Sequence, residues 1–143
     1  MLKAVLDTNV LISALLSSDG IPNQLLRQAK LTYQLFISRE ILEEVRDVLL
    51  KPKIQRKMSL TEDKILAFLS TIQRVAIVVE NPFPLPIIIE DDPDDNVILA
   101  CALKAKVDYL VSGDIHLKRI GSYKGISMVS PSEFFAIINQ MTY

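Results

Sequence analysis

The chain has 143 residues, half of them hydrophobic, and a mean hydropathy of +0.29. A chain of this length can bury a substantial core, so we expect one domain over residues 1–143. It carries 16 basic residues, 17 acidic residues and a single cysteine, Cys101, which excludes an intramolecular disulfide and a zinc site built from several thiolates. No run reaches the roughly 18 apolar residues of a membrane span, and an acid as early as Asp7 argues against a signal peptide. The composition therefore predicts a cytoplasmic protein that does not enter a membrane.

Strand-like and helical patterns alternate along the chain. In chain order we predict a strand at 3–6, helices at 9–17 and 22–29, a strand at 32–38, helices at 38–50 and 61–74, a strand at 75–80, a helix at 96–106, a strand within 108–114, a strand at 125–130 and a helix at 131–140. Ser38 and Thr61 are suitable N-caps for the helices that follow them. Alternation of this kind is typical of βαβ units, so we predict an α/β fold with a parallel sheet covered by helices on both faces.

Acidic residues gather where the predicted strands end. Asp7 follows the apolar run "AVL", Asp114 follows "YLVSG", and the segment "DDPDD" at 91–95 precedes a predicted helix. In an open α/β sheet ligands bind outside the carboxyl ends of the strands, at the switch in strand order. Several carboxylates in one place need counter-charge, and hard divalent cations such as Mg²⁺ prefer oxygen ligands. The pattern therefore favours a metal site of the kind that hydrolyses phosphodiesters.

Four segments together resemble a known family. "LDTNVLIS", "SREILEEVRDVLLKPK", "DDPDDNVILACA" and "DYLVSGDIHL" occur in this order and are similar to PIN-domain nucleases, in particular to the toxin-like subgroup related to the VapC toxins of toxin–antitoxin pairs. The similarity runs from residue 2 to about residue 131. It implies a three-layer, Rossmann-like PIN fold with about five parallel strands and helices on both faces. It also implies Mg²⁺- or Mn²⁺-dependent cleavage of single-stranded RNA, leaving 5′-phosphate and 3′-hydroxyl ends, by a homodimer with a small antitoxin partner.

The resemblance also assigns roles to individual residues. The matched catalytic and metal-binding acids are Asp7, Glu44, Asp95 and Asp114, and the matched supporting residues are Asn9, Asp92 and Ser112. For Ser112 we expect a hydrogen bond to metal-bound water or to a substrate phosphate. Helical geometry independently favours Glu44, because it flanks the apolar stripe of its helix while Glu43 points to the opposite side.

Simpler explanations exist for most of these residues. Asp7 could be a helix N-cap, Asn9 could serve the helix start, and Ser112 could serve a turn. Asp92 before Pro93 is also a good N-cap, and acids in the first helical turn favour the helix dipole without any metal. A PIN-fold module that binds RNA or a protein without cutting it is the alternative function.

Three further features have less specific interpretations. The bases between Arg46 and Lys57, with Lys118 and Arg119, form either a solvated charged face or a guide for an RNA backbone. Cys101 is expected in the core, and His116 at the surface or in a loop. For the homodimer we expect an apolar surface on the first helices, around Leu15, Leu16 and Leu25.

Overall fold

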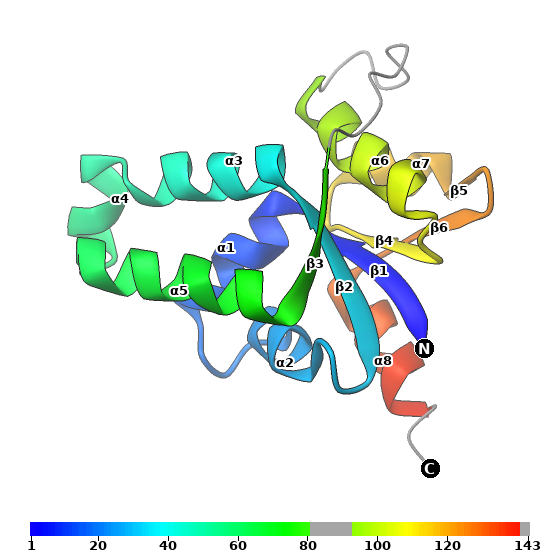
Figure 1. The fold of residues 1–143 in the computed structure, drawn as a ribbon, viewed down its shortest axis with the longest axis horizontal. Coiled ribbons are helices and arrows are strands. Elements are labelled where there is room, and N and C mark those ends of the chain that lie inside the picture. Colours follow the sequence, from blue (N-terminus) through cyan, green and yellow to red (C-terminus); the bar gives the residue numbers. More distant parts are fainter. Residues whose placement is uncertain (81–92, 141–143) are drawn as a thin grey trace.

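The computed structural model describes residues 1–80 and 93–140. Its elements, in chain order, are β1 (Leu2–Leu6), α1 (Thr8–Leu16), α2 (Ile21–Gln28), β2 (Tyr33–Ser38), α3 (Arg39–Leu49), α4 (Pro52–Lys57), α5 (Glu62–Val75), β3 (Ala76–Val79), α6 (Pro93–Ala105), β4 (Tyr109–Val111), α7 (Ile115–Ile120), β5 (Ser122–Tyr123), β6 (Ile126–Val129) and α8 (Pro131–Gln140). Strands and helices alternate through most of the chain, as predicted (Figure 1).

The central sheet has the strand order β3-β2-β1-β4-β6-β5. Its first five strands in this order pair in parallel, whereas β5 pairs with β6 antiparallel. The predicted α/β fold with about five parallel strands is therefore confirmed, and the structure adds one short antiparallel strand, β5, at one edge. β5 was not predicted because a strand of two residues is too short to show an alternation of apolar and polar residues. The order reverses between β1 and β4, which makes their carboxyl ends the switch point of the sheet.

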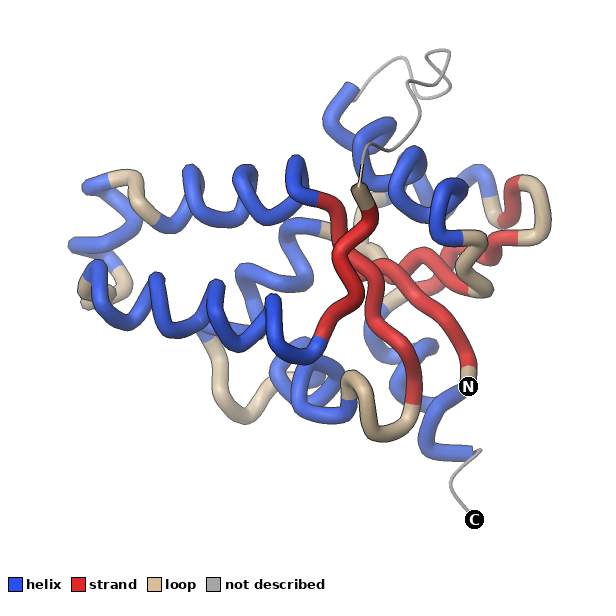
Figure 2. The backbone as a smooth tube through the Cα atoms, in the orientation of Figure 1, coloured by secondary structure: helices blue, strands red, loops and turns tan. Residues whose placement is uncertain are grey.

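Helices pack against both faces of the sheet. α6 packs against β1, β2, β3 and β4 on one face, while α8 packs against β4 on the other (Figures 1 and 2). Alternate β2 residues Tyr33, Leu35 and Ile37 are buried, as the period of two in a strand requires. The Tyr33 ring meets the Phe134 ring of α8 edge to face, with centroids 5.0 Å apart. Its hydroxyl donates to the Leu25 carbonyl at 2.7 Å, and burial raises the pKa of Tyr33 well above its usual value.

α3, α4 and α5 form an arm that extends beyond the sheet (Figures 1 and 2). Ile41, Val45 and Leu49 form the buried stripe of α3, in agreement with the predicted helix face. The Ser38 hydroxyl accepts a hydrogen bond from the Ile41 amide at 3.2 Å, so the predicted N-cap is confirmed. Thr61 caps α5 in the same way, accepting from the Lys64 amide at 3.2 Å.

Two short helices differ from the sequence prediction. Pro52 does not simply interrupt the chain but begins α4, where the missing N–H of proline costs no helical hydrogen bond. α7 follows β4 in a segment for which no helix was predicted. Both helices have six residues, fewer than two turns, so neither repeats an apolar position often enough to show a helical period.

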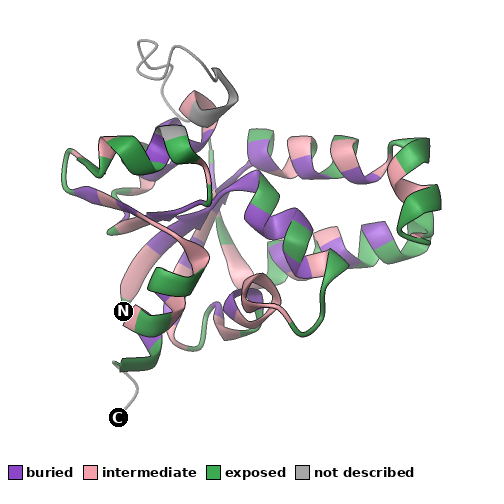
Figure 3. Cartoon of the chain, turned by 180° about the vertical axis from the view of Figure 1, so that it is seen from behind, coloured by how far each residue is buried: buried purple, intermediate pink, exposed green. Residues whose placement is uncertain are grey.

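The predicted dimer surface is partly wrong. Leu25 is completely buried in the core, so it cannot contribute to an interface without unfolding. Leu15 is half-buried against the same core, and Leu16 is exposed. Viewed from behind, the buried residues concentrate along the central sheet and the helix faces turned toward it (Figure 3). None of the described helices has the length and hydropathy needed to span a membrane.

Candidate functional site

Asp7 is the single residue between β1 and α1, at the switch point of the sheet. Its backbone N–H donates to the Val111 carbonyl at the end of β4, at 2.9 Å. Its carbonyl accepts from the amides of Val10 and Leu11 in the first turn of α1, at 3.0 and 3.1 Å. These bonds join the end of the neighbouring strand to the start of the helix. The backbone of Asp7 is therefore held at both sides.

The Asp7 carboxylate does not cap the helix that it precedes. The residue occupies the N-cap position of α1, but its side chain makes no capping hydrogen bond. It is only 6 % exposed, and its Oδ2 accepts a hydrogen bond from the Ser112 hydroxyl at 2.7 Å. Burial of a carboxylate is costly unless hydrogen bonds or counter-charge compensate it. The capping interpretation of Asp7 is therefore wrong, and its side chain is directed to the end of β4 instead.

Ser112 links two of the predicted acids. Its hydroxyl donates to Asp7 and accepts from the backbone N–H of Asp114 at 2.9 Å. The side chain is almost completely buried, and the Ser112 amide donates to the Val129 carbonyl at 2.9 Å. A hydroxyl that donates to a carboxylate forms one of the stronger hydrogen bonds in proteins. The bond from the Asp114 amide, two residues on, agrees with the turn role considered for Ser112. The bond to Asp7 was not predicted, because Asp7 and Ser112 meet only through the pairing of β1 with β4.

Asp114 lies between β4 and α7. It is half-buried, and its carbonyl accepts the Lys118 amide at 3.1 Å in the first turn of α7. The bonds through Ser112 thus bring Asp7 and the backbone of Asp114 to the same end of two adjacent strands. We refer to Asp7, Ser112 and Asp114 as the Asp–Ser–Asp link. The proximity predicted for the two strand-end acids is confirmed for this link.

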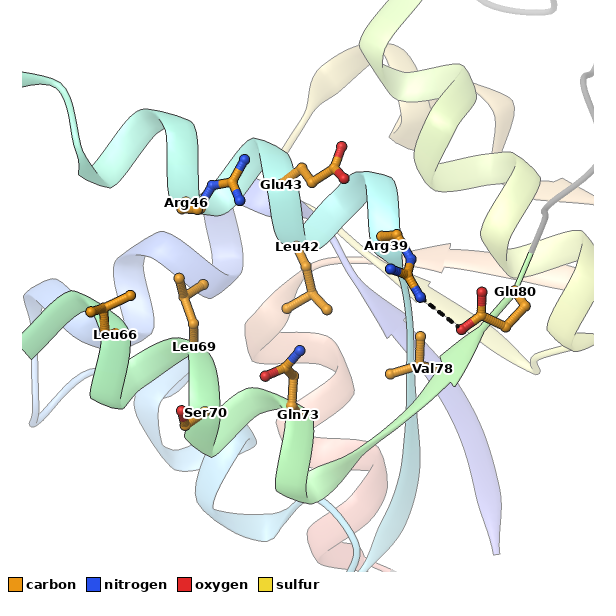
Figure 4. Close-up of a pocket in the computed structure, with 10 residues that line it drawn as sticks. All are labelled: Arg39, Leu42, Glu43, Arg46, Leu66, Leu69, Ser70, Gln73, Val78 and Glu80. Carbon is orange, nitrogen blue, oxygen red and sulfur yellow. Dashed lines mark hydrogen bonds and ion pairs between the residues drawn. The ribbon is translucent and has the colours of Figure 1, made fainter.

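Glu44 lies on α3 and is half-buried, whereas Glu40 and Glu43 are exposed. This difference agrees with the predicted helix face. Glu43 instead lines a groove of about 490 Å³ between α3, α5 and the end of β3 (Figure 4). The groove contains apolar side chains of α3 and α5, and an ion pair between Arg39 and Glu80 closes one end at 3.3 Å. No member of the Asp–Ser–Asp link lines it, so groove and link are separate features of the surface.

The remaining predicted site residues are placed only in part. The backbone of Asp95 belongs to the first turn of α6, and its side chain lies outside the described part of the structure. Asp92 lies outside the described residues altogether. The backbone of His116 belongs to α7, where its side chain is also outside the description. Asn9 is exposed in the first turn of α1.

The chemistry of the link fits a hard divalent cation. Asp7 and Asp114 offer only oxygen atoms, and Mg²⁺ typically takes one or two protein carboxylates and completes its shell with water and substrate. Among the described side chains no three His, Cys, Asp or Glu residues form a group that could hold a metal ion. The Thr8 hydroxyl, next to Asp7, is buried without a hydrogen-bond partner in the described residues. A buried hydroxyl is costly to leave unpaired.

Cys101 has no part in this site. Its side chain is completely buried in α6, which confirms the prediction that it belongs to the core. Burial raises the pKa of the thiol to about 12, against a smaller lowering effect of a hydrogen bond with Ser38. The thiolate, which is the form that attacks substrates or binds metals, is therefore scarce at neutral pH.

Comparisons with known proteins agree with this architecture. A family model described as "PIN domain" matches residues 3–116. A protein of Methanocaldococcus jannaschii, MJ1680, is 31 % identical over 144 residues, and the match covers 93 % of this chain and 89 % of that protein.

Two solved structures share the fold at low sequence identity. The crystal structure of VapBC2 from Rickettsia felis, bound to a DNA fragment from its promoter, aligns with a TM-score of 0.59 and 16 % identity, covering 90 % of this chain and 98 % of that one. PAE2754 from Pyrobaculum aerophilum aligns with a TM-score of 0.63 and 14 % identity, and the alignment covers 97 % of this chain and 90 % of that one. At these identities the likeness concerns the fold.

Proposed function

Because the chain belongs to the PIN domain family, whose members are generally nucleases that use divalent metals, we propose that it is a metal-dependent endoribonuclease. The substrate is single-stranded RNA, and the enzyme is a single PIN domain over residues 1–143. The observation that carries the proposal is the Asp–Ser–Asp link at the switch point of the sheet. It is a buried carboxylate oriented by a hydroxyl, beside a second acid, where α/β folds bind ligands.

The residues of the site have separate tasks in this proposal. Asp7 and Asp114 hold Mg²⁺ or Mn²⁺, and Glu44 and Asp95 complete the acidic site. When bound, the ion lowers the pKa of a coordinated water and offsets charge on the attacked phosphate. Ser112 fixes the orientation of the Asp7 carboxylate, which is the task of hydrogen-bonded partners behind metal ligands. Asn9 and Asp92 are supporting residues.

Water is the proposed nucleophile. Attack by water avoids a covalent enzyme intermediate, and the buried Cys101 is unsuited to forming one. The proposed cleavage leaves 5′-phosphate and 3′-hydroxyl ends, as the family resemblance implies.

The same proposal includes protein partners. A small antitoxin-like protein is proposed because VapBC2 shares the fold, and pairing of two copies is proposed as a family habit, with the exposed Leu16 as a candidate contact. We place the enzyme and its antitoxin-like partner in the cytoplasm. Light scattering of the purified protein at micromolar concentration should give about twice the monomer mass of 16.1 kDa, and a mass near 16.1 kDa would refute the pairing.

The direct experiment is RNA cleavage with a matched pair of variants. Purified protein is incubated with unstructured RNAs in Mn²⁺ and in EDTA, alongside Asp114→Asn and Asp108→Asn. Asp108 is an acid at the opposite end of β4, where its carboxylate accepts the Lys3 amide at 2.9 Å. We expect cleavage in Mn²⁺ only, a loss of about 100-fold or more in Asp114→Asn, and near wild-type rates in Asp108→Asn. Undiminished cleavage in EDTA would refute the metal mechanism, and RNA binding without cleavage would favour the non-cutting module.

A further inference from the structure

The tip of the α3–α4–α5 arm carries a cluster of positive charge. Four cations, Lys51, Lys53, Arg56 and Lys57, lie within seven residues, with no acid between Leu50 and Leu60. All four side chains are exposed, and Figure 3 shows much of α4 as exposed surface at the end of the arm. We call these four residues the basic tip. The chain as a whole has a net charge of −1, so the charge of the tip is local.

Neighbouring acids do not neutralise the basic tip. The ion pairs seen between described residues use Arg39, Arg46 and Lys118, and none of them uses a cation of the tip. The nearest acid before the tip along the chain is Asp47, which pairs with Arg46 at 3.4 Å. After it come Glu62 and Asp63, in the first turn of α5, where they favour the helix dipole. An excess of positive charge remains for a partner.

α3 connects the basic tip to the acidic site. The helix begins at the carboxyl end of β2 and runs outward to α4 (Figure 1). Glu44 lies five residues before Leu49, the last residue of α3, which corresponds to roughly 7.5 Å at the rise of an α-helix, and Lys51 follows two residues later. A strand of RNA with one nucleotide at the acidic site can therefore reach the tip with nearby nucleotides.

Resting on the proposed function, we propose that the basic tip binds the phosphate backbone of the RNA substrate outside the cleavage site. An acidic site repels phosphates, so positive charge nearby raises both the encounter rate and the affinity. The tip has no aromatic residue between Leu50 and Leu60, and single-strand binding without aromatic platforms gives no base stacking. The tip thus contributes affinity that is independent of sequence and sensitive to salt.

The test compares two triple variants of equal charge. Lys53→Gln/Arg56→Gln/Lys57→Gln removes three cations of the tip, and glutamine suits a helix about as well as lysine. Arg27→Gln/Lys30→Gln/Arg74→Gln removes three exposed cations near the amino ends of β2 and β3. Binding of a labelled 20-nucleotide oligouridine is measured by fluorescence anisotropy in EDTA, where the proposed cleavage does not compete, over a range of salt concentrations.

The expected results are specific to the tip. The tip triple should weaken RNA binding at least about tenfold at low salt and reduce the slope of log Kd against log salt by about 2, since each lost single-strand phosphate contact removes about 0.7. The control triple should stay within about twofold of wild type, and circular dichroism should show both variants folded. Equal weakening in the two triples, or unchanged binding in the tip triple, would overturn the inference.

Two further outcomes separate this inference from the proposed function. If the tip triple retained RNA binding but lost binding to phosphatidylserine vesicles, the tip would be a membrane contact and the inference would be wrong. If the tip triple lost RNA binding while wild-type protein failed to cleave any RNA in Mn²⁺, the inference would stand and the proposed function would fail.

Discussion

Replacing Ser112 with alanine tests the Asp–Ser–Asp link. The change removes the donor to Asp7 Oδ2 at 2.7 Å and the acceptor of the Asp114 amide at 2.9 Å. A hydrogen bond to a charged group contributes about 1.5–3 kcal/mol, and the half-buried Asp114 amide can recover part of its loss by bonding to water. We therefore expect Ser112→Ala to lower the free energy of unfolding by about 2 kcal/mol. For a chain of this length that corresponds to a decrease in Tm of about 7 °C.

The assay is thermal melting with and without Mn²⁺, together with RNA cleavage. Because Ser112 orients a proposed ligand, the variant should also bind Mn²⁺ about 10- to 100-fold more weakly and show a smaller rise in Tm when the ion is added. Thr61→Ala is the matched control, since it removes a hydroxyl that caps α5 far along the arm and should cost about 1 kcal/mol with an unchanged response to metal. If Ser112→Ala melted and bound Mn²⁺ like the wild type, our reasoning about the link would be refuted.

Three other predictions address the surroundings of the site. Glu44→Gln should lose most RNA cleavage, whereas Glu43→Gln should stay within a few-fold of wild type, because only Glu44 is half-buried; equal losses would show that the helix face is misassigned. Asp7→Asn should lose RNA cleavage in Mn²⁺, yet without metal it should melt no lower than wild type, because it removes one charge from an acidic site and still accepts from Ser112; a lower Tm without metal would contradict this reasoning. The pKa of Cys101 is raised to about 12 in the folded protein, so the unfolded state loses the thiol proton at a lower pH than the folded state does. The free energy of unfolding should therefore fall above about pH 9, by about 1.4 kcal/mol at pH 10. Chemical denaturation at pH 8 and pH 10 should show a smaller decrease in Cys101→Ala, and an equal decrease would contradict the assignment.

The sequence predicted the fold well where elements are long and periodic. α3 and α5 show both an apolar stripe and a capping residue, and each begins within one residue of the predicted position. The four central strands of the sheet are short, largely apolar runs, which is typical of buried parallel strands. β5 was missed because its two residues pair through a hairpin, and this pairing leaves no pattern in so short a segment.

The candidate site was only partly predictable for a different reason. That Asp7 and Asp114 lie at the same edge follows from parallel strands, and this much the sequence could indicate. The contact between Ser112 and Asp7 depends on β1 and β4 being neighbours, and strand order cannot be derived from local patterns. Leu25 shows the same limit, because an apolar residue on an amphipathic helix can face either the core or a partner.

The central claim is that Asp7 binds a divalent metal ion, and direct Mn²⁺ titration followed by electron paramagnetic resonance tests it. The signal of free Mn²⁺ reports how much ion the protein removes from solution, without any need for an RNA substrate. Wild type and Asp108→Asn should bind Mn²⁺ alike, and Asp7→Asn should bind it at least about tenfold more weakly. Equal binding by wild type and Asp7→Asn would contradict the claim.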